Sequence, residues 1–189
     1  QDCCTRVRSN EALRRYPVSL GIVGVDGSSH LIEASRSMGD QFEIWNSVDT
    51  IDTTLSSVCI THAHLGHIDG LGLFGKEVMG VQDLTVHCSQ SVANLIEQNP
   101  IWRALREEGV IVPTVWKANQ PFEPSPGCGF SIRAVHVPHR DEFSDNHALL
   151  IEGGRTTVLF MPDHDTWDET LDGASIRDWL SELGVHIAL

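Results

Sequence analysis

Short apolar segments alternate with polar turns along the first half of the chain. Residues 18–25 form an apolar run that predicts a buried strand, and a second short strand is expected over 30–34. The polar turn over 26–29 separates the two runs, so they are expected to form a β-hairpin. Further strands are predicted over 56–60 and 84–88, where apolar and β-branched residues are concentrated.

Apolar residues at helical spacing predict helices between and after these strands, over residues 35–46, 71–79, 89–98 and 100–108. Asp69 and Ser89 are candidate N-caps of the second and third helices, because their side-chain oxygens can accept a hydrogen bond from a free backbone N–H. The stretch over 116–129 contains three prolines and is predicted to be a loop.

The second half repeats the alternation, with strands predicted over 130–137, 147–152, 156–161 and 185–189, polar loops over 138–145 and 162–168, and a helix over 176–183. The sequence has neither a short-period repeat nor a linker that would divide it. We therefore expect one α/β domain over residues 1–189, in which helices cover the sheets rather than a purely doubly wound sheet.

Composition narrows the possible partners. Of 189 residues, 41% are hydrophobic and 21% are charged, values that are typical of a globular protein. The 13 Lys and Arg against 26 Asp and Glu give a net charge of −13, which opposes binding to nucleic acid and to anionic membranes. No apolar run approaches the roughly 18 residues of a membrane span, and no signal peptide is recognisable. Five cysteines without a regular framework favour a reducing compartment, so a cytoplasmic location is expected.

The strongest chemical signal is the segment T-H-A-H-L-G-H over residues 61–67. It places His62, His64 and His67 directly after a predicted strand, where the imidazoles can converge on one point. Three or four neutral nitrogen or carboxylate donors make a transition-metal site. A single histidine here would be typical of a surface or capping position, but three of them beside glycines indicate a metal site.

Two later polar loops also follow predicted strands. V-H-V-P-H-R-D-E over 135–142 contains His139, and M-P-D-H-D over 161–165 contains Asp163. Either loop alone is typical of a solvated turn. Together with the histidine segment, they are what a site assembled at one edge of a sheet requires.

These segments carry a resemblance. The strand followed by T-H-A-H-L-G-H resembles the H-x-H-x-D-H loop of the metallo-β-lactamase superfamily. Within it, the residues over 61–80, V-P-H-R-D-E-F-S and L-F-M-P-D-H-D-T-W resemble the subgroup of coenzyme PQQ (pyrroloquinoline quinone) synthesis protein B. The resemblance extends roughly from residue 18 to residue 189. It implies a metallo-β-lactamase-like αββα sandwich.

Carried over to this chain, the resemblance implies that His62, His64 and His139 hold one metal ion. His67 would belong to a second position, and Asp163 would be shared between the two positions and act as a general base. The expected cofactor is Zn²⁺, with Fe²⁺ or Mn²⁺ as alternatives, and one or two ions. His139 is preferred to His136 because the residues after it match the motif.

The chain also departs from the superfamily pattern. Gly66 stands where an acidic ligand of the second metal is usual, so one metal, or a weak second one, is expected. The superfamily's last metal histidine would lie beyond Leu189, so we expect a fold that is incomplete at both ends. Residues 1–17 would then be the remnant of a cysteine-containing region, in which Cys3 and Cys4 resemble part of a structural zinc site.

Three functions remain open at this point. The resemblance implies a metal-dependent enzyme, hydrolase-like or oxidative, related to PQQ biosynthesis and acting on a small-molecule or peptide-derived substrate. The second is a generic metal-dependent hydrolase of esters or phosphodiesters. The third is a non-catalytic protein that carries PQQ or its precursor.

Overall fold

The first half of the chain forms a five-stranded sheet in a computed structural model that describes residues 2–48 and 54–189, without the side chains of 2–4 and 11. In spatial order its strands are β1 (Leu20–Val23), β2 (Ser29–Ile32), β3 (Leu55–Ile60), β4 (Leu84–Cys88) and β5 (Ile111–Val115). β1 and β2 pair antiparallel, so the predicted hairpin is confirmed, and the later neighbours pair parallel. The parallel arrangement brings the ends of β2, β3 and β4 to one edge of the sheet.

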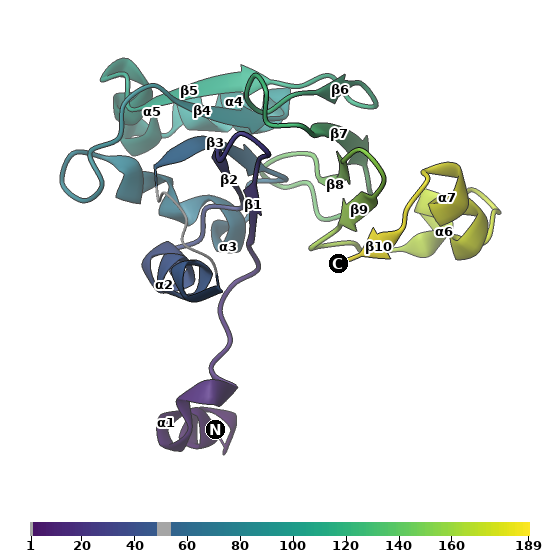
Figure 1. The fold of residues 1–189 in the computed structure, drawn as a ribbon, viewed down its shortest axis with the longest axis horizontal. Coiled ribbons are helices and arrows are strands. Elements are labelled where there is room, and N and C mark those ends of the chain that lie inside the picture. Colours follow the sequence, from purple (N-terminus) through teal and green to yellow (C-terminus); the bar gives the residue numbers. More distant parts are fainter. Residues whose placement is uncertain (1, 49–53) are drawn as a thin grey trace.

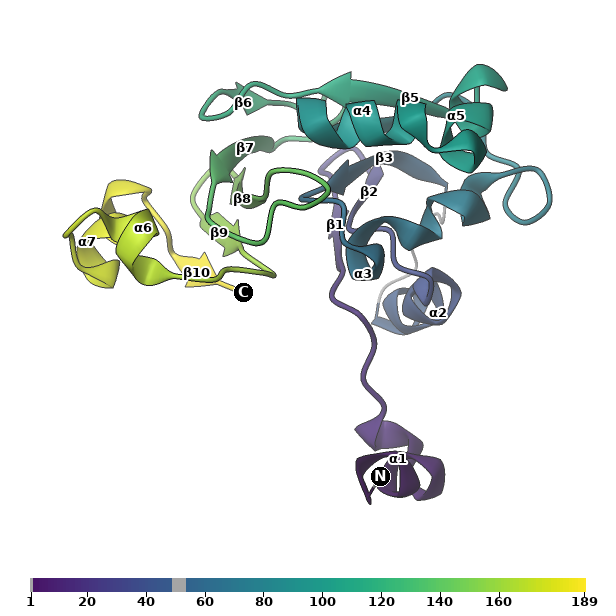
Figure 2. The ribbon, with the colours of Figure 1, turned by 180° about the vertical axis from the view of Figure 1, so that it is seen from behind.

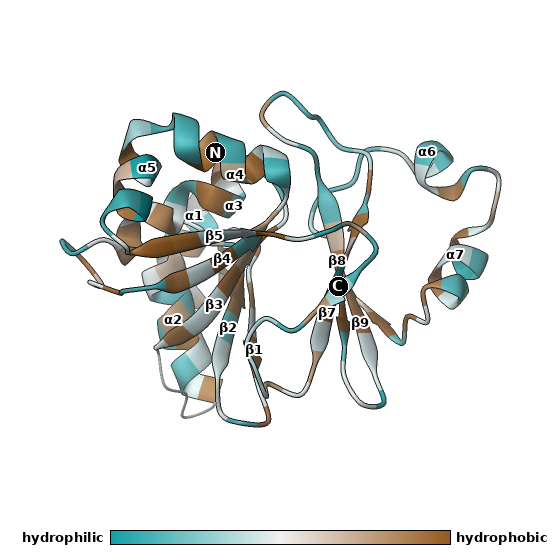
Figure 3. Cartoon of the chain, turned by 90° about the horizontal axis from the view of Figure 1, so that it is seen from above, coloured by the Kyte–Doolittle hydropathy of each residue, from teal (hydrophilic) through white to brown (hydrophobic). Residues whose placement is uncertain are grey.

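The second half forms another five-stranded sheet, in the order β10 (Ile187–Ala188), β9 (Thr157–Phe160), β8 (His147–Glu152), β7 (Ser131–His136) and β6 (Pro121–Phe122). Its strands pair antiparallel except for β10, which lies parallel to β9. The two sheets stand face to face in the view of Figure 3.

Helices lie on the outer sides of the two sheets. Beside the first sheet are α2 (Met38–Val48), α3 (Leu65–Ile68), the 3₁₀ helix η2 (Asp69–Phe74), α4 (Gln90–Gln98) and α5 (Pro100–Glu107). Beside the second are α6 (Trp167–Leu171) and α7 (Ile176–Glu182). The N-terminal α1 (Asp2–Ser9) and the 3₁₀ turn η1 (Glu11–Leu13) stand apart at the end of an extended segment (Figures 1 and 2). Within the described ranges, no helix has the length and apolarity needed to cross a bilayer.

Three apolar layers hold this arrangement together. In β2 and β3, Leu31 and Val58 pack toward the helices, whereas their neighbours Ile32 and Cys59 pack between the sheets. The same alternation in β8 puts Leu149 between the sheets. Its neighbours Ala148 and Leu150 point to the opposite face, where they form a third cluster with residues of α7. Because successive strand side chains point to opposite faces, each inner strand serves two layers. The predicted αββα arrangement is therefore confirmed.

Some predicted elements are wrong or missing. The helix expected over 71–79 is the shorter 3₁₀ helix η2 followed by turns, because closely spaced glycines disfavour an α-helix there. Asp69 does not cap it; its carboxylate accepts a hydrogen bond from Arg36 Nη2 at 2.5 Å. The strand β5 was not predicted because it contains Pro113, which an edge strand tolerates. The cap of α4 is confirmed, since Ser89 Oγ accepts from the Val92 N–H.

The segment that follows the histidine loop lies directly against the end of β2. The Ala34 N–H donates to the His67 carbonyl at 2.8 Å, and the Gly70 N–H donates to the Ala34 carbonyl at 2.7 Å. A Cβ on Gly70 would lie 2.2 Å from the Ser35 carbonyl oxygen, closer than any real contact. Only glycine therefore fits at position 70 while both hydrogen bonds are kept.

We predict that Gly70→Ala lowers the free energy of unfolding by about 1–3 kcal/mol, because the added methyl group forces the two backbones apart. Gly72→Ala is the matched control, since a Cβ there meets nothing within 4 Å. Its effect should stay within about 0.5 kcal/mol. Urea unfolding of both variants measures the difference, and equal midpoints would contradict the predicted contact.

Candidate metal centre

Loops from both sheets deliver the predicted ligands to one edge of the molecule. His62 and His64 follow β3, and His67 lies in the short helix α3 that begins one residue after His64. From the other sheet, His139 follows β7 and Asp163 follows β9. The structure brings all five predicted residues together.

Four donor atoms face one another at the spacing of a metal site. His64 Nδ1 lies 3.0 Å from both His62 Nε2 and His139 Nε2. Asp163 Oδ2 lies 3.3 Å from His62 Nε2 and 3.4 Å from His139 Nε2. Zn–N bonds of about 2.0–2.1 Å at tetrahedral angles set donor atoms about 3.3–3.4 Å apart. The four groups therefore fit a divalent transition metal.

Each of the three imidazoles has a partner behind it. His62 Nδ1 lies 2.9 Å from Thr61 Oγ1, His64 Nε2 lies 3.1 Å from Glu142 Oε1, and His139 Nδ1 lies 2.8 Å from Asp165 Oδ1. A hydrogen bond from one ring nitrogen leaves the other with its lone pair. These partners therefore aim three nitrogen lone pairs at the centre.

The surroundings keep the central imidazole neutral. Burial, followed by the neighbouring His67, His64 and His139, lowers the pKa of His62 to about 3. On the outside, the hydrogen bond with His139 lowers the pKa of Asp165. Neutral imidazole is the form that binds metals, so His62 is ready to bind at neutral pH.

A second group of donors lies next to the first. His67 Nε2 is 3.2 Å from Asp163 Oδ2, so this carboxylate oxygen touches histidines of both positions. On its other side, His67 Nδ1 is 3.6 Å from Oε1 of the buried Glu33. Burial lowers the pKa of His67, but the carboxylates of Glu33 and Asp163 outweigh it, and the pKa is raised. The second position has fewer donors than the first.

Other candidates lie outside this cluster. His136 is exposed at the end of β7, and His164 Nε2 bonds instead with Thr170 Oγ1. Cys59 is buried in the core with its thiol free. The side chains of Cys3 and Cys4 lie outside the described part of the chain.

Two contributors were missed by sequence reasoning, Glu33 and Thr61. Both are fully buried and lie at the ends of β2 and β3. The only available signal was a carboxylate within the predicted strand over 30–34, which is an unusual place for an unpaired charge.

A groove of about 380 Å³ begins at His139 and leads away from the centre. Four carboxylates line it, those of Asp141, Glu142, Asp145 and Glu169, and none of its described lining residues is Lys or Arg. Of the five predicted ligands, His139 alone lines this groove.

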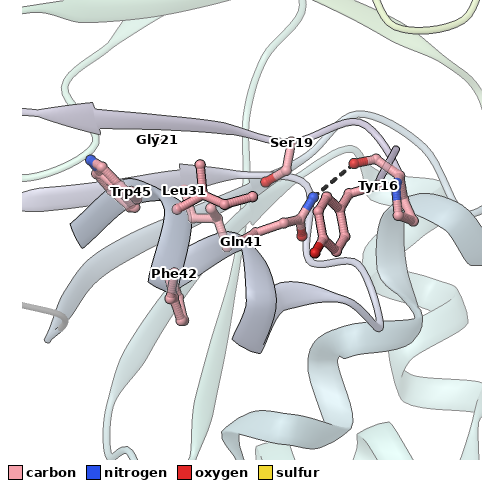
Figure 4. Close-up of a pocket in the computed structure, with 9 residues that line it drawn as sticks. Tyr16, Ser19, Gly21, Leu31, Gln41, Phe42 and Trp45 are labelled. Atoms are coloured by element: carbon pink, nitrogen blue, oxygen red, sulfur yellow. Dashed lines mark hydrogen bonds between the residues drawn. The ribbon is translucent and has the colours of Figure 1, made fainter. Parts of the chain in front are cut away.

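A separate hollow of about 310 Å³ lies between β1 and α2, walled by Tyr16, Phe42 and Trp45 (Figure 4). Gln41 crosses it and donates through Nε2 to the Pro17 carbonyl at 2.7 Å. Its lining contains none of the five predicted metal ligands. The metal centre and this hollow are therefore distinct features.

Solved structures share this fold at low sequence identity. The Zn²⁺-bound PqqB of Methylobacterium extorquens superposes with a TM-score of 0.70 at 16% identity, over 91% of this chain and 63% of that one. The metallo-β-lactamase fold protein YhfI of Bacillus subtilis gives 0.59 at 18% identity, over 83% of this chain and 62% of that one. A diphosphatase of the PhnP family gives a TM-score of 0.57 at 16% identity, over 95% of this chain and 77% of that one. The chain thus spans less than two thirds of the length of PqqB and YhfI.

No curated protein matches the chain at the level of sequence. The family model described as the beta-lactamase superfamily domain matches residues 30–184, which include every strand from β3 to β9 and all five predicted ligands. The chain therefore belongs to the β-lactamase superfamily, with the metallo-β-lactamase fold.

Proposed function

We propose that this chain is a metal-dependent enzyme whose ion is held by His62, His64, His139 and Asp163. The observation that carries the proposal is the convergence of their four donor atoms, in which His64 lies 3.0 Å from the other two imidazoles and Asp163 lies 3.3–3.4 Å from His62 and His139. Three imidazoles and a carboxylate suit Zn²⁺ first, and also Fe²⁺ or Mn²⁺. The second position around His67 supports at most a weaker ion.

A bound Zn²⁺ lowers the pKa of water to about 7 and polarises a carbonyl or phosphoryl oxygen. The chain's own residues supply the rest. Asp163 lies between the two positions and, with its side chain about one-third exposed at 34%, accepts a proton from water or substrate. Thr61, Glu142 and Asp165 hold the imidazoles in one orientation, so the centre keeps its shape while substrate binds.

The groove beside the centre supports a substrate that is neutral or cationic where it contacts the protein. Its four carboxylates repel a phosphate backbone, and the net charge of −13 acts in the same direction at long range. Arg140 lies 3.9 Å from Glu142 Oε1, which partly offsets its charge. We therefore propose a small-molecule or peptide-derived substrate, and no nucleic acid.

The likeness to PqqB in fold and in the three motifs supports a role related to PQQ biosynthesis. Gly66, which supplies no carboxylate to the second position, favours an oxidative or single-metal reaction over two-metal hydrolysis. A generic hydrolase is the second candidate, supported by the fold shared with the PhnP-family diphosphatase. A carrier would instead bind PQQ in a one-to-one ratio without turnover.

We predict that the purified chain binds about one transition-metal ion, and that His62→Ala and His64→Ala each abolish binding at stoichiometric Zn²⁺ because one strong donor is lost. Elemental analysis after dialysis against metal measures the count, and Co²⁺ absorption reports the coordination. His136→Ala is the matched control, since this exposed histidine lies outside the cluster. A metal-saturated wild type that retains no ion would refute the proposed centre.

A charge reversal tests the role of the groove. Glu169→Lys should raise kcat/KM for bis(p-nitrophenyl) phosphate by about two- to fivefold at low salt, since it changes the local charge by two units near the substrate. Turnover of uncharged p-nitrophenyl acetate should not change. Glu182→Lys on α7 carries the same charge change outside the groove and serves as the control.

The outcomes separate the candidate functions. If metal-loaded wild type hydrolyses neither ester, the generic hydrolase fails, and stoichiometric binding of PQQ without turnover then favours a carrier over an oxidative enzyme. If Glu169→Lys and Glu182→Lys have equal effects on the phosphodiester, the groove is not where that substrate binds.

A further inference from the structure

A fully buried carboxylate lies behind the first metal position and outside its four donors, although its oxygen lies within 4.8 Å of donor nitrogens of His62 and His67. Glu33 follows β2 directly and has 0% of its surface exposed. Its backbone φ is 69°, in the left-handed region that residues other than glycine rarely adopt. A buried charge and a strained backbone both cost stability, so a residue of this kind points to a role in the site.

The contacts of Glu33 lead to two histidines. Oε1 accepts a hydrogen bond from the Thr61 hydroxyl and lies 3.6 Å from His67 Nδ1. The Thr61 hydroxyl has one hydrogen, and Glu33 receives it, so Thr61 Oγ1 accepts from His62 Nδ1 at 2.9 Å. One carboxylate therefore faces the back of His67 directly and the back of His62 through Thr61.

The remaining donors and acceptors leave Glu33 few alternatives. Among the described residues, Glu33 Oε2 and His67 Nδ1 have no hydrogen-bond partner, and the one ion pair of Glu33 is with His67. No described Lys or Arg pairs with this carboxylate. The carboxylate oxygens are therefore directed at Thr61 in front of His62 and at His67.

We propose that Glu33 is a positioning residue, which acts through Thr61 to fix the proton of His62 on Nδ1, so that the Nε2 lone pair of His62 faces the first metal position. The inference rests on the proposed metal centre for its purpose, but its geometry is a property of the metal-free chain. Glu33 also places a buried carboxylate behind His67 of the second position, to which Gly66 supplies none. A carboxylate or threonine that orients a histidine ligand typically changes metal affinity by about 10–100-fold.

Nitrogen-detected NMR of the metal-free, ¹⁵N-labelled chain tests the proton positions. The expected result is the Nδ1–H form for His62, whose imidazole is neutral. In Thr61→Val, which keeps the shape but lacks the hydroxyl, His62 should become a mixture of both forms while His67 is unchanged. Thr61→Ser should restore the wild-type spectrum. Finding His62 in the Nε2–H form in the wild type would overturn the proposal.

Zn²⁺ titration and urea unfolding of Glu33→Gln separate positioning from ordinary structural support. Glutamine keeps the shape and one acceptor but removes the buried charge, so Zn²⁺ affinity should fall about 10–100-fold while the urea midpoint stays equal or rises. A fall in the midpoint with unchanged affinity would assign Glu33 a purely structural role. If the NMR result holds but the wild type binds no Zn²⁺, the proposed function fails and the positioning of His62 stands.

Discussion

The backbone contact between residues 67–70 and the end of β2 is the constraint on which the metal centre depends. Its two hydrogen bonds tie the helix that contains His67 to the strand that delivers Glu33. Because Gly70 has no side chain, the two segments approach more closely than any other residue would allow. Without that approach, the helix that contains His67 would lie farther from Glu33. A glycine that touches no ligand thus sets the geometry behind the site.

Electrostatics explain how so many histidines share a small volume in an acidic protein. Protonated imidazoles 3.0 Å apart would repel one another strongly, so burial favours the neutral form of His62. The carboxylates of Glu142 and Asp165 stay at the partly exposed outer side, where water screens them. The result is a neutral His62 at a centre surrounded by carboxylates, which favours a divalent cation over an anion at the same place.

The sequence was sufficient for most of the strand pattern, with β5 as an exception, and for the candidate ligands that lie close together in the chain. His62, His64 and His67 share one loop, so their convergence follows from local spacing. The choice of His139 over His136 depended on a motif; the structure explains it, because β7 ends at His136 and leaves His139 free to turn back toward the other sheet. Glu33 could not be predicted, because its partners are 28 residues or more away and meet it only after β2 and β3 pair. The 3₁₀ helix η2 was missed for a related reason, since Gly70 serves a tertiary contact that opposes the local helical pattern.

The open space at Gly66 bears on how many ions the centre holds. A Cβ at this position meets nothing within 4 Å, so packing does not explain the absence of a carboxylate there. The second position therefore has His67 and the shared Asp163 facing inward, and only indirect negative charge from Glu33 behind. Two inward donors bind a transition metal much less tightly than the four of the first position, because each missing donor must be replaced by water. The chemistry of the chain is thus concentrated at one strong position, and the second acts mainly to place a histidine and a carboxylate beside it.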